Sequence, residues 1–264
     1  MIRMTKGKCF LKIKKRPDFL IVGAQKCGTT SLFHFLSQHP LVCMPEVKEV
    51  HFFDLRYQKG TNWYLDQFRV PFSFVKKFVA GEASPYYIFH PLVPERVAKH
   101  LPGVKLIFML RNPVIRAYSH FYHQKKLGTE PLDSFREAVA IEAERLGQEE
   151  FRLMREEIMI SQHFQDFSYI ARGMYAQQIE RWLRFFPMSQ MHFIKSEDFF
   201  ANPEDEMRQV HRFLGVPEII PDDIIPQNSN EYPALDEDFA NELKLLFAED
   251  TKILTGLIGQ KFQW

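Results

Sequence analysis

One short stretch of the sequence has the residue types and spacing needed to bind a phosphate group. It runs from Gly23 to Thr30 and lies between an apolar run, residues 19–22, and a segment with helical spacing. Glycines permit a tight turn, so that successive backbone N–H groups and the start of the following helix can face an anion. Lys26 adds a full positive charge, and hydroxyl donors follow the second glycine at Thr29, Thr30 and Ser31. These residues together indicate a phosphate-binding loop.

The loop differs from the Walker A loop of enzymes that cleave ATP or GTP. That motif reads G-x-x-x-x-G-K-S/T and places its lysine directly after the second glycine. Here Thr29 follows Gly28, and Lys26 stands two residues before that glycine. The lysine therefore approaches the phosphate from elsewhere. This spacing argues against cleavage of ATP or GTP, but it is compatible with binding of another nucleotide.

Such a loop needs a strand before it and a helix after it, and the rest of the chain repeats this alternation. Apolar runs predict buried strands at residues 19–22, 77–81, 104–110 and 191–194. Helical spacing of apolar residues, with proline at some helix starts, predicts helices at residues 32–36, 91–100, 114–126, 171–186, 203–214 and 236–258. The alternation predicts an α/β fold, with a P-loop-type, mostly parallel sheet and helices on both faces.

One region interrupts this alternation. The composition, with 45% hydrophobic and 25% charged residues, is that of one large globular domain with an apolar core. Residues 131–168, however, are charged, helical in pattern and poor in strand signal. We expect them to form a helical insertion over the sheet, which either contributes to a substrate cleft or is a plain pair of surface helices.

Charge is unevenly distributed along the chain. Residues 1–16 hold seven basic side chains and no acidic one, whereas the remainder holds 27 basic and 33 acidic residues, a net charge of −6. We interpret the basic N-terminal arm as a solvated tail, with a partner-binding arm as the alternative. The formal net charge of the whole chain, +1, gives no reason to expect nucleic-acid binding.

Membrane and redox signals are weak. No run of about 18 apolar residues predicts a membrane span, and no apolar stretch follows the basic N-terminus as in a secretory signal. The cysteines, Cys9, Cys27 and Cys43, are too few for a disulfide framework, which predicts a reducing, cytoplasmic location. Cys27 lies inside the phosphate loop, where the helix start and Lys26 are expected to lower its pKa and make it oxidisable.

Five segments, taken in order, carry further motifs: residues 17–31 around the loop, 48–54 (K-E-x-H-F-F-D), 81–87, 110–119 (R-x-P-x-x-R-A-x-S), and 175–187 together with 213–216. They resemble the motifs of sulfotransferases that use 3′-phosphoadenosine 5′-phosphosulfate (PAPS) as donor. The heparan sulfate N- and O-sulfotransferases and their bacterial relatives are the most similar group. The resemblance runs from Pro17 to Trp264 and predicts one sulfotransferase domain over residues 17–264.

This resemblance implies a donor site. It places the 5′-phosphosulfate of PAPS on the loop, with Lys26 at the leaving oxygen and the rest of the contacts from Cys27, Gly28, Thr29, Thr30 and Ser31. It places the 3′-phosphate on Arg111 and Ser119, and the fork of an arginine suits phosphate oxygens. The spent donor would be 3′-phosphoadenosine 5′-phosphate (PAP). No metal ion is implied, and the sequence has no cluster of ligands at metal-binding spacing.

The resemblance also places the catalytic general base at Glu49. We expect a carboxylate in a dry cleft to have a raised pKa and to take a proton from an acceptor hydroxyl. His51 is the rival base because its ordinary pKa lies nearer neutrality. Asp54 is expected to orient the acceptor or the base.

Two departures from this group of sulfotransferases bear on the acceptor. Ala83 stands where the group has a lysine, and a late Cys-Cys loop with basic residues is replaced by residues 226–233. Together with the slightly acidic body of the chain, these departures argue against a highly sulfated polymer. We expect a small-molecule, glycan or carrier-bound acceptor, such as a neutral saccharide, a lipid or a polyketide-type hydroxyl.

Two other functions are weighed against this one. A P-loop nucleotide kinase would need a Walker lysine and a magnesium-holding aspartate after a strand, and the sequence shows no clear version of either. A non-catalytic glycan- or nucleotide-binding module on the same fold would have lost the base or the lysine, yet Glu49 and Lys26 are both present. The sequence therefore favours an active sulfotransferase.

Overall fold

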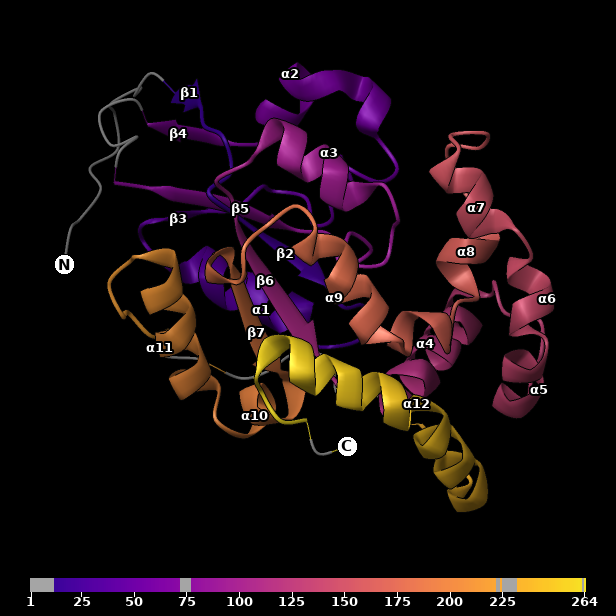
Figure 1. Ribbon diagram of the computed structural model, residues 1–264. Helices are drawn as coiled ribbons and strands as arrows, with labels where there is room; N and C mark the ends of the chain where they lie inside the picture. Colours follow the sequence, from indigo (N-terminus) through magenta and orange to yellow (C-terminus); the bar gives the residue numbers. More distant parts are fainter. Residues whose placement is uncertain (1–11, 72–76, 222–223, 225–231, 263) are drawn as a thin grey trace.

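The centre of the fold is a parallel β-sheet (Figure 1). The structure is a computed structural model, and it describes residues 12–71, 77–221, 224, 232–262 and 264. Within these residues the strand order is β3-β5-β2-β6-β7. The strands are β2 (Phe19–Gly23), β3 (Val42–Cys43), β5 (Val79–Ala83), β6 (Lys105–Leu110) and β7 (Met191–Lys195). The predicted P-loop-type α/β fold is confirmed.

Strand β2 occupies the middle of this sheet. Phe19 lies opposite Gly81 of β5 on one side and opposite Lys105 of β6 on the other. Every residue from Phe19 to Val22 is fully buried, as expected for a parallel strand whose two faces are both covered. The strand therefore delivers the phosphate loop to the carboxyl edge of the sheet from a fixed position.

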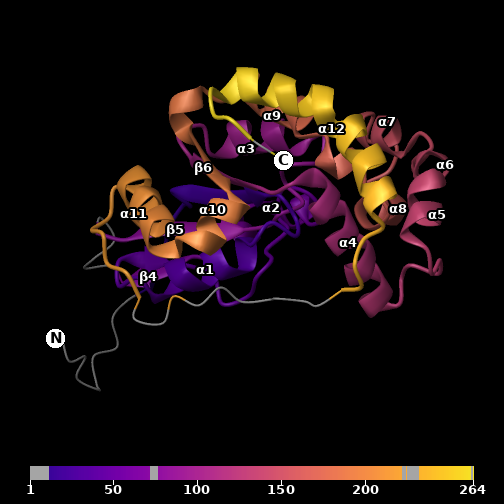
Figure 2. The ribbon, with the colours of Figure 1, turned by 90° about the horizontal axis from the view of Figure 1, so that it is seen from below.

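Helices cover both faces of the sheet (Figures 1 and 2). One face carries α1 (Thr29–Gln38), α10 (Ser196–Ala201) and α11 (Pro203–Leu214). The other carries α3 (Val93–His100) and α9 (Tyr175–Leu183). Outside them, α12 (Glu237–Ile258) packs against α9 and α4 (Pro113–Leu127). None of the helices in the described ranges is both long and apolar enough to cross a membrane.

Residues 131–168 extend beyond α4 as a succession of short helices (Figure 1): α5 (Phe135–Ala140), α6 (Glu142–Leu146), α7 (Glu149–Met154) and α8 (Gln162–Asp166). A buried carboxylate, Glu130, holds this region to the body. Arg145 donates to both of its oxygens, at 2.6 and 2.9 Å, and the Tyr169 hydroxyl donates to Oε2 at 2.7 Å. The start and the end of the segment are therefore tied to one side chain.

A small antiparallel pair of strands was not predicted from the sequence. Strand β1 (Lys12–Lys14) pairs with β4 (Arg69–Pro71), and Lys14 Nζ lies 2.9 Å from Asp66 Oδ2. The interpretation of residues 1–16 as a solvated tail is therefore wrong for residues 12–14; residues 1–11 lie outside the described residues. The remaining elements are α2 (Gly60–Leu65) and the 3₁₀ turns η1 (Tyr57–Lys59), η3 (Ala171–Gly173) and η4 (Met188–Gln190).

Candidate active site

The phosphate loop connects β2 to α1, as the sequence predicts. Gly28 is the residue before α1 and has φ 93°, in the left-handed region that favours glycine. A Cβ atom at Gly28 would lie 2.9 Å from Phe200 Cζ and 3.3 Å from Met109 Cε, so a side chain there would be crowded as well as strained. Gly28 offers no side-chain cap, and the first turn of α1 holds no acidic residue. The start of α1 is therefore suited to an external anion.

Lys26 lies in a strongly positive part of the molecule. Burial lowers the pKa of Lys26, and the charges of Arg111, Lys126 and Lys48 lower it further. Three further cationic side chains thus act on Lys26 at the carboxyl edge of the sheet. This concentration of like charge is unfavourable without a counter-ion and favours binding of a polyanion.

Arg111 follows β6 directly and lies against the loop. Its Nη1 donates a hydrogen bond to the backbone oxygen of Lys26 at 3.1 Å. Asn112 caps α4 with its side chain, so the chain turns into this helix immediately after Arg111. Ser119 is buried on the same helix. The structure therefore places Arg111 beside the phosphate loop, and it places Ser119 on the helix that starts at the same turn.

The end of the 226–233 segment returns to α4. Residues 226–231 lie outside the described residues, but the Tyr232 hydroxyl lies 3.3 Å from Ser119 Oγ, and the Tyr232 ring stacks on Tyr122 with centroids 4.9 Å apart. The Tyr118 hydroxyl donates to Pro233 O at 3.0 Å. Tyr232 is thus a neighbour of the expected 3′-phosphate residue Ser119 that sequence reasoning left unassigned.

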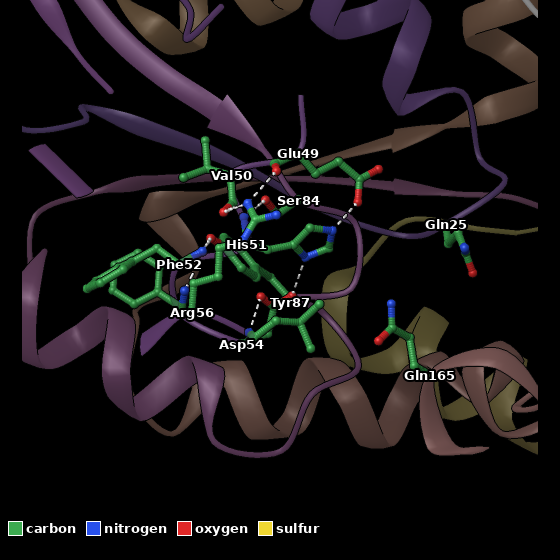
Figure 3. Close-up of polar contacts among 12 residues, drawn as sticks. Gln25, Glu49, Val50, His51, Phe52, Asp54, Arg56, Ser84, Tyr87 and Gln165 are labelled. Carbon is green, nitrogen blue, oxygen red and sulfur yellow. Dashed lines mark hydrogen bonds and ion pairs between the residues drawn. The ribbon is translucent and has the colours of Figure 1, made fainter. Parts of the chain in front are cut away.

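Glu49, His51 and Asp54 form one continuous line of contacts (Figure 3). His51 Nε2 lies 2.9 Å from Glu49 Oε2, and His51 Nδ1 lies 2.8 Å from Asp54 Oδ2. Asp54 is buried, with a 2% exposed fraction, and Arg56 donates to Val50 O at 2.8 Å beneath the same turn. The Glu49 carboxylate is therefore held by hydrogen bonds within the partly buried segment between β3 and α2.

This arrangement corrects two expectations about the pKa values. Burial alone would lower the pKa of His51, but the hydrogen bonds to Asp54 and Glu49 outweigh it and raise that pKa to about 10. Burial raises the pKa of Glu49, but the hydrogen bond from His51 and the charge of Lys48 outweigh it, so this pKa lies below that of an ordinary glutamate. The raised pKa expected for Glu49 is therefore wrong. The carboxylates bonded to both ring nitrogens favour the protonated form of His51, which has no free nitrogen to accept a proton, and this argues against His51 as the rival base.

Lys48 links this segment to the phosphate loop. Its Nζ donates to Thr30 Oγ1 at 3.2 Å and to Glu49 Oε1 at 3.1 Å. One ammonium group thus contacts a hydroxyl at the start of α1 and the expected base at the same time. Sequence reasoning quoted Lys48 only as part of a motif and gave it no role.

His123 is a second residue that sequence reasoning missed. Burial lowers the pKa of His123, the positive charge of Lys26 lowers it further, and the negative charge of Glu49 opposes this effect. His123 therefore lies within electrostatic reach of both side chains. It stands four residues after Ser119 on α4, on the same face of the helix, and this spacing could have indicated its position.

Across from Glu49, a buried arginine organises two glutamines. Figure 3 shows Gln25 and Gln165 on the side toward which the Glu49 carboxylate points. Arg172, only 3% exposed, donates to Gln25 Oε1 at 2.6 Å and to Gln165 O at 2.6 Å. The Gln25 amide group is thereby fixed with its oxygen toward Arg172, which leaves its N–H₂ group as a donor. Among the described residues, no group of three or more metal-ligating side chains is arranged to hold a metal ion.

Cys27 does not have the reactive environment expected from the sequence. Its side chain is fully buried, with Sγ 3.8 Å from the Tyr175 hydroxyl and 3.6 Å from Gln25 O. Burial raises the pKa of the thiol to about 11, although the charges of Arg116 and Arg111 oppose this effect. The expectation of a lowered pKa and of ready oxidation is therefore wrong, because the side chain is buried in the apolar core.

We expect Cys27 to resist alkylation in the folded protein. At neutral pH, iodoacetamide should label the partly exposed Cys43 within minutes, while Cys27 stays unmodified until the protein is denatured, because only the thiolate reacts. Peptide mass spectrometry of native and denatured samples measures both sites in one experiment. Labelling of Cys27 at the rate of Cys43 would show that the loop opens readily and that the thiol is accessible.

The chain is similar in sequence and in fold to known sulfotransferases. The family model of the sulfotransferase domain matches residues 16–235. The crystal structure of a sulfotransferase from Alicyclobacillus acidocaldarius is similar with a TM-score of 0.70 and 34% identity, over 94% of this chain and 98% of that chain. At 15% identity, the sulfotransferase domain of the curacin biosynthetic pathway shares the fold, with a TM-score of 0.51 over 93% of this chain and 98% of that one.

Two curated relatives are longer proteins. The human bifunctional heparan sulfate N-deacetylase/N-sulfotransferase 2 is 32% identical over a region that covers 76% of this chain and 22% of that protein. The membrane-associated sulfotransferase kil1 of Dictyostelium discoideum is 25% identical over 94% of this chain and 66% of that protein. The chain thus spans only part of each. With a family match over most of its length and a close structural relative over nearly all of it, the chain belongs to the sulfotransferase domain family.

Proposed function

We propose that this protein transfers a sulfuryl group from PAPS to an acceptor hydroxyl, with Glu49 as the general base. The proposal is supported most directly by Lys48, whose ammonium group lies 3.2 Å from Thr30 Oγ1 in the phosphate loop and 3.1 Å from Glu49 Oε1. A donor phosphate on the loop and an acceptor oxygen at Glu49 would therefore be neighbours. This is the geometry that a direct transfer between them requires.

In this mechanism the acceptor oxygen attacks sulfur opposite the bond to the leaving phosphate, by analogy with in-line phosphoryl transfer. Glu49 takes the proton of the acceptor hydroxyl as the new S–O bond forms. Negative charge develops on the leaving phosphate of PAP, where Lys26 and the hydroxyls of Thr29, Thr30 and Ser31 stabilise it. His51 stays protonated, and with Asp54 behind it this cation holds the Glu49 carboxylate in place.

For the acceptor we propose an uncharged or weakly charged hydroxyl compound, such as a saccharide, a lipid or a carrier-bound polyketide. The human relative acts on heparan sulfate, which makes a glycan one natural candidate. The body of this chain carries 27 basic and 33 acidic residues outside its first sixteen positions. Repulsion from this acidic excess disfavours a densely sulfated polymer. Ala83, where similar enzymes have a lysine, also lacks a cation for such a chain.

Calorimetric titration tests the donor site without knowledge of the acceptor. We expect PAP to bind without magnesium and more tightly than ATP with magnesium, because the loop lacks the lysine position of ATP-cleaving enzymes. Radiolabelled PAPS then identifies the acceptor class in a screen of saccharides, lipids and carrier-bound hydroxyls. Preferential binding of ATP with magnesium would contradict the proposed function and favour a nucleotide kinase.

Arg111→Ala should weaken PAP binding by about 10- to 100-fold, because a charge-assisted hydrogen bond contributes about 1.5–3 kcal/mol. If Arg111 binds the 3′-phosphate, its loss should leave the affinity for adenosine 5′-phosphate, which lacks that group, unchanged. Titration of both nucleotides separates this role from the support that Arg111 gives to the loop through Lys26 O. An equal loss of affinity for both ligands would assign Arg111 to loop structure instead.

A further inference from the structure

A buried carboxylate that the proposed mechanism does not use lies behind the Glu49 segment. Glu82, in β5, is completely buried and forms no ion pair with the described residues. Its partners are hydroxyl groups: Tyr64 and Tyr87 donate to Oε1 at 2.9 and 2.8 Å, and Ser84 donates to Oε2 at 2.7 Å. Burial raises the pKa of Glu82 to about 7, and the three hydroxyl donors hold it below the value that burial alone would produce. Burial of a carboxylate without an ion pair is costly, and the hydroxyl donors offset only part of that cost.

Two of these hydroxyls also receive backbone N–H groups. His51 N–H donates to Ser84 Oγ at 3.0 Å, and Phe52 N–H donates to the Tyr87 hydroxyl at 2.8 Å (Figure 3). Phe53 N–H donates to the same hydroxyl at 3.3 Å. A hydroxyl carries one proton. Since each hydroxyl gives its proton to the buried carboxylate, its oxygen is left as an acceptor and faces the backbone. The carboxylate therefore fixes the direction of both hydrogen-bond chains, the one through Ser84 and the one through Tyr87.

The backbone of residues 51–53, which these hydrogen-bond chains hold, is strained. His51 has φ 53°, which is unfavourable for a residue with a Cβ atom and persists only where its surroundings enforce it. At this φ the ring of His51 meets Glu49 at 2.9 Å and Asp54 at 2.8 Å. The contacts of His51 with Glu49 and Asp54 thus depend on a backbone conformation that the N–H hydrogen bonds to Ser84 and Tyr87 maintain.

We propose that Glu82 is a positioning residue, whose carboxylate orients the Ser84 and Tyr87 hydroxyls so that they hold residues 51–53 and aim Glu49 at the acceptor. This inference rests on the proposed function for its effect on transfer, but its structural part does not. A carboxylate is needed rather than another polar group, because it accepts from every hydroxyl around it and donates to none. An amide at this position would offer an N–H₂ group to one hydroxyl and force it to turn its proton elsewhere.

Tyr64 provides a matched control. It donates to the same oxygen of Glu82 as Tyr87 does, and both tyrosines are essentially fully buried. Among the hydrogen bonds of the described residues, however, the Tyr64 hydroxyl reaches only Glu82, and its ring stacks on Phe52 with centroids 4.5 Å apart. Phenylalanine keeps each ring and removes one hydroxyl. The two substitutions therefore remove equivalent bonds to the carboxylate, but only one of them releases the backbone.

The test compares Glu82→Gln, Tyr87→Phe and Tyr64→Phe in the full chain at pH 8, above the Glu82 pKa of about 7. We expect faster amide hydrogen exchange at residues 51–53 and a lower His51 pKa by NMR titration in Glu82→Gln and Tyr87→Phe, and neither change in Tyr64→Phe. PAP affinity should stay within about twofold of the wild type in all three variants. With an acceptor from the screen, transfer should fall by about 10- to 100-fold in the first two variants only, as expected for a small displacement of a catalytic group.

Equal exchange and equal His51 titration in Tyr87→Phe and Tyr64→Phe would overturn the proposal, and this comparison decides it even if Glu82→Gln fails to fold. A wild-type protein that binds no PAP and transfers no sulfuryl group would contradict the proposed function instead. In that case the exchange and titration data still decide whether Glu82 positions the 51–53 segment, so the two failures are distinguishable.

Discussion

Lys26→Ala should lower the rate of sulfuryl transfer by about 100- to 1,000-fold, the usual effect of removing a group that stabilises charge in a transition state. Burial and the surrounding charges of Arg111, Lys126 and Lys48 lower the pKa of Lys26. An anion in this site is therefore surrounded by cations in a poorly solvated environment, where each of them contributes strongly. PAP affinity should fall as well, by about tenfold, because the leaving phosphate loses one charged partner.

The measurement pairs a transfer assay with calorimetric titration of PAP. Lys125→Ala is the matched control, since it removes the same charge from a side chain that points to Asp133 at 2.7 Å on the surface. We expect the control to be indistinguishable from the wild type at moderate ionic strength. If both variants lost affinity equally, overall charge rather than the position of Lys26 would account for the effect.

Glu49→Gln should reduce transfer by about 100- to 10,000-fold, the range that general base catalysis contributes. Glutamine keeps the size of the side chain and a hydrogen bond from His51, but it cannot take a proton at neutral pH. PAP affinity should be retained, because among the hydrogen bonds of the described residues Glu49 reaches the phosphate loop only through Lys48. The exposed Glu46, in the same segment, provides the control substitution Glu46→Gln. Normal transfer in Glu49→Gln would contradict the assignment of the base.

The pH dependence of transfer tests the same assignment. The base acts in its ionised form. The effect of burial on Glu49 is outweighed by the His51 hydrogen bond and the Lys48 charge, so the pKa of Glu49 lies below that of an ordinary glutamate. As the pH falls, transfer should therefore be lost at a lower pH than it would be if the base were an ordinary glutamate. On the alkaline side it should decline as pH rises through the His51 pKa of about 10, because the cation that holds Glu49 is lost. A steep change near pH 6.5 would instead indicate a freely titrating histidine as the base.

Much of the sheet could be predicted from the sequence because its strands are long apolar runs with a single interpretation. Strands β2, β6 and β7 begin and end within one or two residues of the predicted positions. Helix α11 runs from Pro203 to Leu214 as predicted, since proline starts it and Gly215, with φ 80°, ends it. By contrast, β1 is three residues long and highly charged, and its structure depends on pairing with the distant β4. No local sequence pattern predicts a pairing partner that is so distant in the chain.

The active-site residues could be named from motifs, but their protonation could not. The types at positions 49, 51 and 54 do not reveal that His51 has a carboxylate on each ring nitrogen, because that follows from its left-handed backbone. The hydroxyls that support this backbone come from the segment that follows β5, which is remote in sequence. Cys27 is a similar case. Its position in the loop suggested reactivity, whereas the direction of its side chain makes it a core residue.

The central place of β2 has a consequence for how the protein is made. This strand leaves the ribosome first among the strands of the parallel sheet. Its neighbours are synthesised later, because β5 ends at Ala83 and β6 ends at Leu110. Until the nascent chain extends past Leu110, the apolar strand β2 lacks its pairing partner on one side. During this time it can bind chaperones or aggregate. The phosphate loop is thus synthesised early and becomes able to hold a nucleotide late. Protection from proteolysis by PAP should therefore be gained only by chains that extend beyond β6.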